Sequence, residues 1–286
     1  MACMFTKDIF PIKVYSLMET INNMKEITIE ELKGLQLEIL KAVHNFCDEN
    51  QIRYSLAYGT LLGAIRHNGY IPWDDDIDIL MPRPDYNKFI KEFNSYSETY
   101  KLISPEMNYS YYAPYANVYD NRTILKETHL DNGNSLGIKI DIFPIDGVSP
   151  NTMMYCIQRR CISILNSLRS IKIEHRYNNH SYKYYLKKKL VSIIPMRIIQ
   201  KLIVYISQLQ HFENSKYARN IVFESKSVPC VQKSSYKKFI LHKFENYKFY
   251  VLEEFDTVLR ASYGDYMKLP PKELRIPHHN FEAYWK

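Results

Sequence analysis

The sequence predicts an α+β protein with an α/β-type core, in which helices flank a mixed sheet, and with a helical insertion. Three observations predict this class. Apolar residues recur at helical spacing in residues 28–50, strand-like patterns occupy residues 77–81 and 100–146, and long helical periodicities with few turn signals fill residues 151–219. The expected organisation is a core at 1–150, a helical insertion or subdomain at 151–219, and a C-terminal part at 220–286 that completes the core.

The first half of the chain carries clear start and stop signals. Thr28 and Glu31 have the spacing of a capping box at the start of the first helix. Residues 53–57 predict a short strand that leads into a Gly59-Thr60 turn, and residues 61–66 predict a short helix whose N-terminus points at that turn. Free N–H groups at a helix N-terminus favour phosphate, so this turn is a candidate phosphate cradle.

Further strands are expected on both sides of a second helix at 85–93. Strand 77–81 precedes that helix and is ended by prolines. After it, the segments YKLISP, YANVYD, TILKET and GIKIDIFPID have strand character. In the last segment the period of two places Ile138, Ile140 and Ile142 on one face and Lys139, Asp141 and Phe143 on the other.

Composition narrows the class of protein. The 286 residues include 46% hydrophobic and 24% charged residues, as expected of a globular chain, and the net charge of +7 favours anionic partners. The five scattered cysteines form no C-x-x-C pair, which argues against a disulfide framework or a cysteine zinc site. With no secretory signal or membrane-length apolar run in view, we expect a cytoplasmic protein with reduced cysteines.

Three aspartates at alternate positions, Asp74, Asp76 and Asp78, form the most informative pattern. On a strand, Asp76 and Asp78 share one face while Ile77 and Ile79 share the other. Two aspartates side by side repel each other, and a hard divalent ion such as Mg²⁺ (or Mn²⁺) relieves that repulsion. A phosphate-binding turn followed by such a pair is typical of the front half of a phosphoryl-transfer site.

Two other interpretations of the acidic cluster fit less well. A solvated acidic turn or helix cap explains one or two aspartates but not an alternating set within an Ile-rich strand. A calcium loop of the EF-hand type requires Gly at its sixth position and Glu at its twelfth, where this chain has Ile79 and Asp85. Asp141 is the candidate third carboxylate, with a strand-end turn as its alternative role, whereas Asp146 before Gly147 is expected to form a turn.

The string GTLLGAIRHNGYIPWDDDIDILMPRPDY resembles the LicD/fukutin-related family of the nucleotidyltransferase superfamily. IDIFPIDGV at 140–148 and YGDYMKLPPKELRIPHH at 263–279 resemble it too, in order, across about residues 30–280. Where many relatives have Phe-Glu-Gly, this chain has Phe244-Glu245-Asn246, a departure that bears on the local loop shape. The resemblance implies a nucleotidyltransferase-like core. It also implies transfer of a phosphorylated head group, often phosphocholine from CDP-choline, to a cell-surface glycan or its lipid-linked precursor.

On this basis we expect a metal-dependent transferase. The diphosphate of a CDP-activated alcohol binds the Gly59-Thr60 turn, Asp76 and Asp78 hold Mg²⁺, and Asp141 is the third ligand or the base. A glycan hydroxyl then attacks the head-group phosphorus and CMP leaves.

Other residues have a binding role and a structural alternative. Arg66 is a candidate diphosphate clamp or a surface arginine. Trp73 either stacks on a base or sugar or packs against the Pro72 turn. Lys268 either neutralises phosphate charge or is solvated, and His278 and His279 are candidates for phosphate contact or proton transfer.

The basic and apolar segment KYYLKKKLVSIIPMRIIQKLIVYI at 183–206 has two interpretations. One is a packed helix pair with a basic outer face, and the other is a peripheral contact with the anionic inner face of the cytoplasmic membrane. A lipid-linked acceptor agrees with the second.

Two rival functions stay open. A DxD-type glycosyltransferase uses an Asp-x-Asp pair to hold a nucleotide-sugar, although the Gly-Thr turn and Asp141 argue against it. A non-enzymatic glycan-binding module needs no clustered aspartates, and no motif for nucleic-acid binding is present. The head group, which ranges from choline to glycerol, ribitol or a sugar phosphate, is also open.

Overall fold

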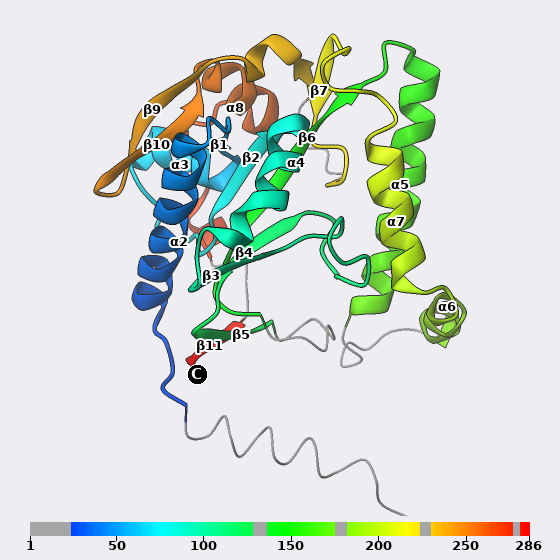
Figure 1. Cartoon of the computed structure of the whole chain (residues 1–286), viewed down its shortest axis with the longest axis horizontal. Helices are drawn as coiled ribbons and strands as arrows, with labels where there is room; N and C mark the ends of the chain where they lie inside the picture. The colour runs from blue at the N-terminus through cyan, green and yellow to red at the C-terminus, as the bar shows by residue number, and fades with distance from the viewer. Residues whose placement is uncertain (1–23, 128–135, 175–181, 224–229, 277–280) are drawn as a thin grey trace, which may run out of the picture.

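A computed structural model describes residues 24–127, 136–174, 182–223, 230–276 and 281–286 (Figure 1). Within these ranges the protein is a mixed α/β structure with seven α-helices: α2 (Ile29–Glu49), α3 (Tyr58–His67), α4 (Arg83–Glu92), α5 (Thr152–Ile173), α6 (Tyr182–Ser192), α7 (Met196–Ser207) and α8 (Phe255–Tyr263). Short 3₁₀ helices occupy Phe93–Ser95, Lys233–Tyr236 and Lys272–Leu274.

A curled mixed sheet forms the centre. Its strand order is β1-β2-β6-β4-β3, with β7 and β8 continuing from the far end of β6. The pair β2–β6 is parallel and the other pairs are antiparallel. The bounds are β1 Ser55–Leu56, β2 Asp78–Pro82, β3 Tyr100–Ile103, β4 Ala116–Asp120, β6 Lys139–Val148, β7 Tyr217–Arg219 and β8 Val231–Gln232. Two further antiparallel pairs stand apart: the hairpin of β9 (Phe239–Phe244) and β10 (Tyr247–Leu252), and β5 (Thr123–Glu127) with β11 (Phe281–Trp285), which are distant in sequence.

The main core lies between this sheet and the helices α2 and α4, which contact β2, β4 and β6. The predicted capping box of α2 is present, because Thr28 Oγ1 accepts from the Glu31 N–H and the Glu31 carboxylate accepts from the Thr28 N–H. Along β6 the predicted alternation is confirmed: Ile138, Ile140 and Ile142 are buried. Phe143 on the opposite face is buried as well, since β6 is a central strand with packing on both faces.

Some predicted boundaries are wrong. The strand expected at 53–57 is reduced to β1, and the helix expected at 61–66 begins at Tyr58. Gly59 and Thr60 therefore lie in the first turn of α3 and not in a turn before it. Tyr58 has φ +44°, a left-handed backbone conformation that lets the chain leave β1 and enter the helix sharply. Helix α4 starts at Arg83, two residues early, because proline is tolerated in a first helical turn.

Helices α5, α6 and α7 lie to one side of the sheet (Figure 1). Helix α5 packs along α7, and Ile162, Ile199 and Ile203 form a small core there with Ile221 and Val222. The helical part of the expected insertion ends at Ser207, since β7 within 217–219 already pairs with β6. The division into 1–150, 151–219 and 220–286 stays a prediction.

Among the described residues, no single helix is long and apolar enough to cross a membrane. The pair Leu186–Ser192 and Met196–Ser207 meets that length and composition only together, and it is bent by 79°.

Candidate active site

Two of the predicted carboxylates lie on neighbouring strands. Asp78 on β2 and Asp141 on β6 are register partners in the parallel pair. The N–H of Asp141 donates to the carbonyl oxygen of Ile77 at 2.9 Å, so that the backbone ladder fixes this pairing. The strand pairing therefore brings together two aspartates that are more than sixty residues apart in sequence.

The segment that enters β2 adds further carboxylates. Oxygen atoms of Asp74, Asp75 and Asp76 lie within 4.8 Å of one another. Asp74 lies over the first turn of α3, since a Cβ added at Gly59 would meet its Oδ2 at 2.5 Å. The carbonyl oxygen of the buried Asp75 accepts from Gln36 Nε2 at 3.0 Å, which ties this segment to α2. Asp74 and Asp75 were not in the predicted ligand set.

Asp78 interacts electrostatically with Asp141 on β6 and with Asp74 and Asp76 on the segment before β2. Burial raises the pKa of Asp78 well above its ordinary value, and the charges of Asp76, Asp141 and Asp74 raise it further. Lys139 acts in the opposite direction. The donors gathered here are carboxylate oxygens, the ligands that Mg²⁺ and Mn²⁺ prefer, and their mutual repulsion is relieved by a cation. The residues therefore fit a divalent ion of this type.

The predicted phosphate cradle differs in detail from the expectation. Thr60 Oγ1 accepts from the N–H of Asp78 at 2.8 Å, and the Thr60 side chain is buried. The hydroxyl oxygen thus anchors β2 to α3, and burial keeps this side chain away from solvent. Gly59 is needed for a different reason, the close approach of Asp74. The N-terminus of α3 and the carboxylates are adjacent, as the sequence predicted.

Arg66 links helix α3 to the segment after α8. The Arg66 guanidinium donates to the carbonyl oxygen of Tyr266 at 2.7 Å and to His67 Nε2 at 3.0 Å. Burial and the nearby Arg275 lower the pKa of Arg66. Burial raises the pKa of Tyr263 on α8, and the charges of Asp78, Asp74 and Asp76 raise it further.

The remaining predicted residues are placed as follows. Trp73 is partly buried against the core, edge-on to His67 at 6.3 Å and with the Arg275 guanidinium 5.6 Å from its ring centroid. These contacts agree with a packing role. Lys268 is exposed at the start of the loop after α8. His278 and His279 lie outside the described residues.

The sequence did not point to Asn117, which orients Asp141. Asn117 on β4 is the register partner of Asp141 and donates from Nδ2 to Asp141 Oδ1. Its own Oδ1 accepts from the hydroxyl of Tyr111, and both side chains are buried. The sequence does show a polar residue in the middle of the strand segment YANVYD. Its partner Asp141 lies on another strand, and only the strand pairing identifies it.

Aromatic side chains form a wall beside these carboxylates. The rings of Tyr115 and Phe143 are 4.3 Å apart, Tyr58 meets Phe143 edge-on at 5.2 Å, and Phe223 lies 5.6 Å from Phe143. Phe143 lies two residues after Asp141 on the same face of β6, which places the wall beside this carboxylate. Burial raises the pKa of Tyr115 and of Tyr58, and the charge of Asp78 raises both further. Phe223 is 41% exposed.

Asp146 has a different role from the turn former that was expected. It lies on β6, is 1% exposed, and binds Arg83 through two contacts, Nε–Oδ1 at 2.6 Å and Nη2–Oδ2 at 2.9 Å. Arg83 also reaches Glu106 at 3.0 Å. The pair fixes the start of α4 against the sheet.

The loop before β2 is held by the β9–β10 hairpin. Glu245 forms its turn with φ +54°, and its carboxylate accepts from the Tyr70 N–H at 3.0 Å. A Cβ on Gly69 would meet Glu245 Oε1 at 2.1 Å. The hairpin turn therefore forms with Asn246 in place of the glycine of many relatives.

The fold and the site define a mixed α/β protein with a carboxylate centre built on two parallel strands. The family described as "LicD/FKTN/FKRP, nucleotidyltransferase domain" matches residues 51–162, which include the whole carboxylate group. The lipopolysaccharide cholinephosphotransferase LicD of Haemophilus influenzae is 32% identical over 91% of this chain and 99% of its own length. The chain belongs to the LicD family.

Two shorter matches cover one segment. Uncharacterized proteins of Rickettsia typhi and Rickettsia prowazekii are 47% and 46% identical over 57 residues, about a fifth of this chain and of each relative.

Proposed function

We propose that this protein transfers a phosphocholine group from CDP-choline to a hydroxyl of a glycan or glycolipid, with release of CMP. The observation that carries the proposal is the carboxylate site, which lies inside the matched segment of a chain that aligns with a cholinephosphotransferase over nearly its full length. The relative's substrate supports a glycan or glycolipid acceptor, and the site supplies groups suited to phosphoryl transfer.

Asp76, Asp78 and Asp141 are the residues that would hold a divalent ion, with Asp74 beside them. A bound Mg²⁺ or Mn²⁺ offsets negative charge on the phosphate oxygens and so stabilises the transition state. The N-terminus of α3 faces the same region, and its free N–H groups favour the diphosphate of the donor. Lys139 and Arg66 add positive charge around the site.

The chain's own residues position the reactants. Asn117 holds Asp141 in one orientation, so a carboxylate oxygen is aimed steadily at the acceptor. Asp141 then either completes the ion site or accepts the proton of the attacking hydroxyl. That hydroxyl attacks the head-group phosphorus, the bond to the bridging oxygen of the diphosphate breaks, and CMP leaves. Most of the rate gain comes from positioning and electrostatics.

The aromatic wall supports choline over glycerol or ribitol as the head group. Aromatic faces attract a quaternary ammonium, which carries a full positive charge and no hydrogen-bond donor. The polyols would instead need polar partners. Tyr115 and the partly exposed Phe223 pack on Phe143, which lies two residues after Asp141 on the same face of β6.

The test is a panel of donors. The protein is incubated with CDP-choline, CDP-glycerol, CDP-ribitol or a nucleotide-sugar, with Mg²⁺ or Mn²⁺, and CMP release is measured with and without candidate glycans. We expect acceptor-dependent CMP release with CDP-choline and none from the Asp78→Asn variant. CMP release with transfer of a sugar would favour a glycosyltransferase, and tight glycan binding without turnover of any donor would contradict the proposal.

A further inference from the structure

A stripe of exposed apolar side chains runs along the outer face of α7. Ile198, Leu202 and Tyr205 follow the spacing of one face of α7 and are 50%, 42% and 68% exposed, and Leu209, just after the helix, is 52% exposed. The opposite face of α7 is buried against α5. At the bend between α6 and α7 more apolar residues are exposed: Leu190, Ile193 and Ile194. Large contiguous apolar surfaces of this kind mark sites of interaction.

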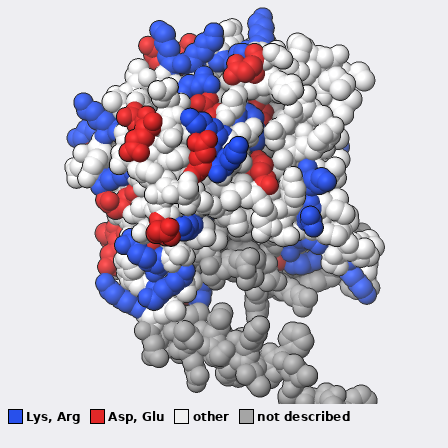
Figure 2. All heavy atoms as spheres, in the orientation of Figure 1, with Lys and Arg blue, Asp and Glu red and all other residues white. Residues whose placement is uncertain are grey.

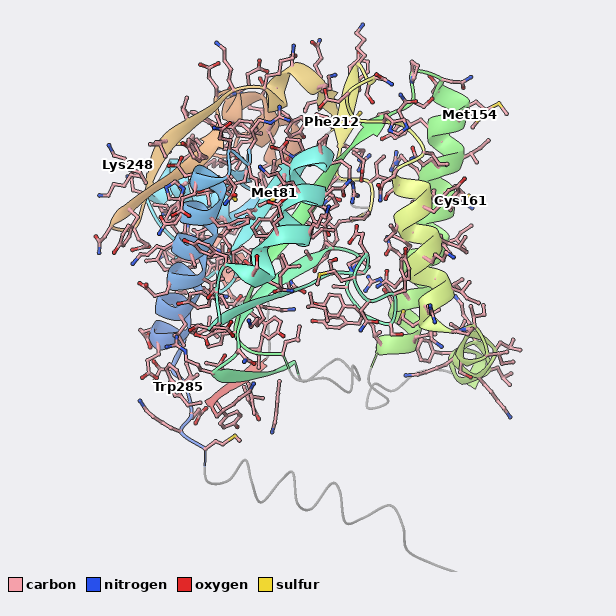
Figure 3. The ribbon with its side chains drawn as sticks, in the orientation of Figure 1. Met81, Met154, Cys161, Phe212, Lys248 and Trp285 are labelled. Atoms are coloured by element: carbon pink, nitrogen blue, oxygen red, sulfur yellow. The ribbon has the colours of Figure 1, made fainter. Side chains whose placement is uncertain are left out.

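Helix α5 also exposes apolar side chains. Met153, Met154, Ile157 and Ile164 are all exposed, and Met154 projects from α5 away from the body of the protein (Figure 3). Much of the surface over α5–α7 is white in Figure 2, with scattered blue and little red.

Positive charges dominate residues 151–219, which include α5, α6 and α7. Residues 151–219 contain thirteen Lys and Arg but two Asp and Glu, a surplus of eleven positive charges, whereas the whole chain carries +7. The rest of the protein is therefore net negative. Lys187, Lys189, Arg197 and Lys201 are exposed on α6 and α7, beside the apolar stripe. Apolar residues flanked by basic ones suit the boundary between lipid head groups and acyl chains, where basic side chains meet anionic lipid.

The contacts of α7 favour docking on a membrane over insertion through it. Gln200 is fully buried and donates from Nε2 to the carbonyl oxygens of Tyr111 and Ala113 at 2.6 and 2.9 Å. Crossing a bilayer would break these bonds and expose the Ile199 and Ile203 face. The outer face can meet a membrane with no such change.

We propose that the outer face of α6 and α7 docks on an anionic lipid bilayer. A second copy of the chain is a poorer occupant, because two such faces would bring like charges together. The docking surface is also connected to the site: Gln200 and Arg169 bind the backbone of residues 111–113, and Tyr111 donates to Asn117, which holds Asp141. A docked enzyme would keep its carboxylates beside a lipid-borne acceptor, a consequence that rests on the function proposed above.

The first test measures sedimentation with vesicles, without donor or acceptor. We expect binding to phosphatidylcholine vesicles that contain phosphatidylglycerol, weakening as salt rises, and none to pure phosphatidylcholine. The variant K187Q/K189Q/K201Q should bind roughly a hundredfold more weakly, since each basic residue near the surface contributes about a factor of five. The matched control K237Q/K243Q/K248Q removes three exposed lysines near and on the β9–β10 hairpin, where Lys248 points away from α5–α7 (Figure 3), and should bind like the parent.

A second variant tests the apolar stripe. L202S/Y205S replaces two exposed residues, so the fold should persist, and vesicle binding should fall while the salt dependence remains. Equal binding to both vesicle types, no binding, or an equal loss in the control would overturn the proposal, as would a dimer in light scattering that L202S/Y205S dissolves. Vesicle binding by a protein with no turnover of CDP-choline would contradict the proposed function and leave the docking surface standing.

Discussion

Asp141 is the register partner of Asp78 on one side and of Asn117 on the other, so three side chains from β2, β6 and β4 form a row across the sheet. Asp78 and Asp141 repel each other, and the amide of Asn117 restrains Asp141 through a hydrogen bond. A carboxylate pair held in this way is preorganised for a cation, because the strands and not the ligand set its spacing.

Removing either carboxylate of the pair should abolish turnover without harming the fold. Asp78→Asn and Asp141→Asn keep the size of the side chain and remove its charge, and we expect CMP release to fall at least roughly a hundredfold. The midpoint of thermal unfolding in the absence of divalent ions should stay or rise for Asp78→Asn, since a partly buried charge among like charges is removed.

Chelation provides the companion measurement. EDTA should stop CMP release by the parent, and added Mg²⁺ or Mn²⁺ should restore it. Full activity in EDTA, or in both variants, would exclude an ion-dependent reaction.

Asn117 should act as a positioning residue. Asn117→Ala leaves the Tyr111 hydroxyl and Asp141 without their shared partner, which we expect to lower activity by about 10- to 100-fold and to raise the Mg²⁺ concentration needed for half-maximal rate. The buried Tyr111 hydroxyl, which loses its bond to Asn117, should lower the free energy of unfolding by about 1–3 kcal/mol. Tyr111→Phe keeps the Asn117–Asp141 bond and should stay within a few-fold of the parent. An unchanged Mg²⁺ requirement in Asn117→Ala would reduce Asn117 to a structural role.

The sequence predicted those parts of the site that depend on local pattern. The capping box at Thr28, the strand faces of β6, and the nearness of Asp78 to the start of α3 all follow from spacing along a few residues. Asn117 and Asp146 could not be placed in this way. Each owes its role to a partner on another element, which strand pairing and helix packing bring close.

The contacts of the Gly59-Thr60 segment also could not be predicted from the sequence. The Gly-Thr pattern was correctly located beside the carboxylates, but the pattern alone does not show which group the Thr60 oxygen meets. In the structure this oxygen accepts from the N–H of Asp78. Helix α3 begins earlier than expected because Tyr58 adopts a left-handed conformation, which side-chain periodicity does not reveal.

Gly59 should be required for activity more than for stability. A methyl group there would meet Asp74 Oδ2 at 2.5 Å, and a carboxylate at the end of a side chain can move aside. Gly59→Ala should therefore fold and lose most of its CMP release. Gly34→Ala is the control, because nothing lies within 4 Å of its added Cβ. It should raise the free energy of unfolding by about 0.5–1 kcal/mol with unchanged activity. Equal activity in the two variants would show that Asp74 is dispensable.

The Arg83–Asp146 pair should contribute to stability. Asp146→Asn leaves a buried guanidinium with Glu106 as its remaining charged partner, and we expect the free energy of unfolding in urea to fall by about 3 kcal/mol. Glu253→Gln removes the exposed partner of Lys238 and should cost much less, because solvent screens that pair. Similar losses in the two variants would contradict a dominant role for burial.

Phe223 should distinguish choline from other head groups. Its ring is 41% exposed and packs with Tyr115 and with Phe143, which lies two residues after Asp141 on the same face of β6. Phe223→Leu keeps an apolar side chain but removes the π face that attracts a quaternary ammonium. We expect the KM for CDP-choline to rise roughly tenfold with little change in kcat, since a cation–π contact contributes about 0.5–2 kcal/mol and more as the site is desolvated. Tyr247→Leu, which alters an exposed aromatic on β10, should leave the KM unchanged. An equal rise in KM for CDP-glycerol would mean that Phe223 shapes the pocket without recognising the choline charge.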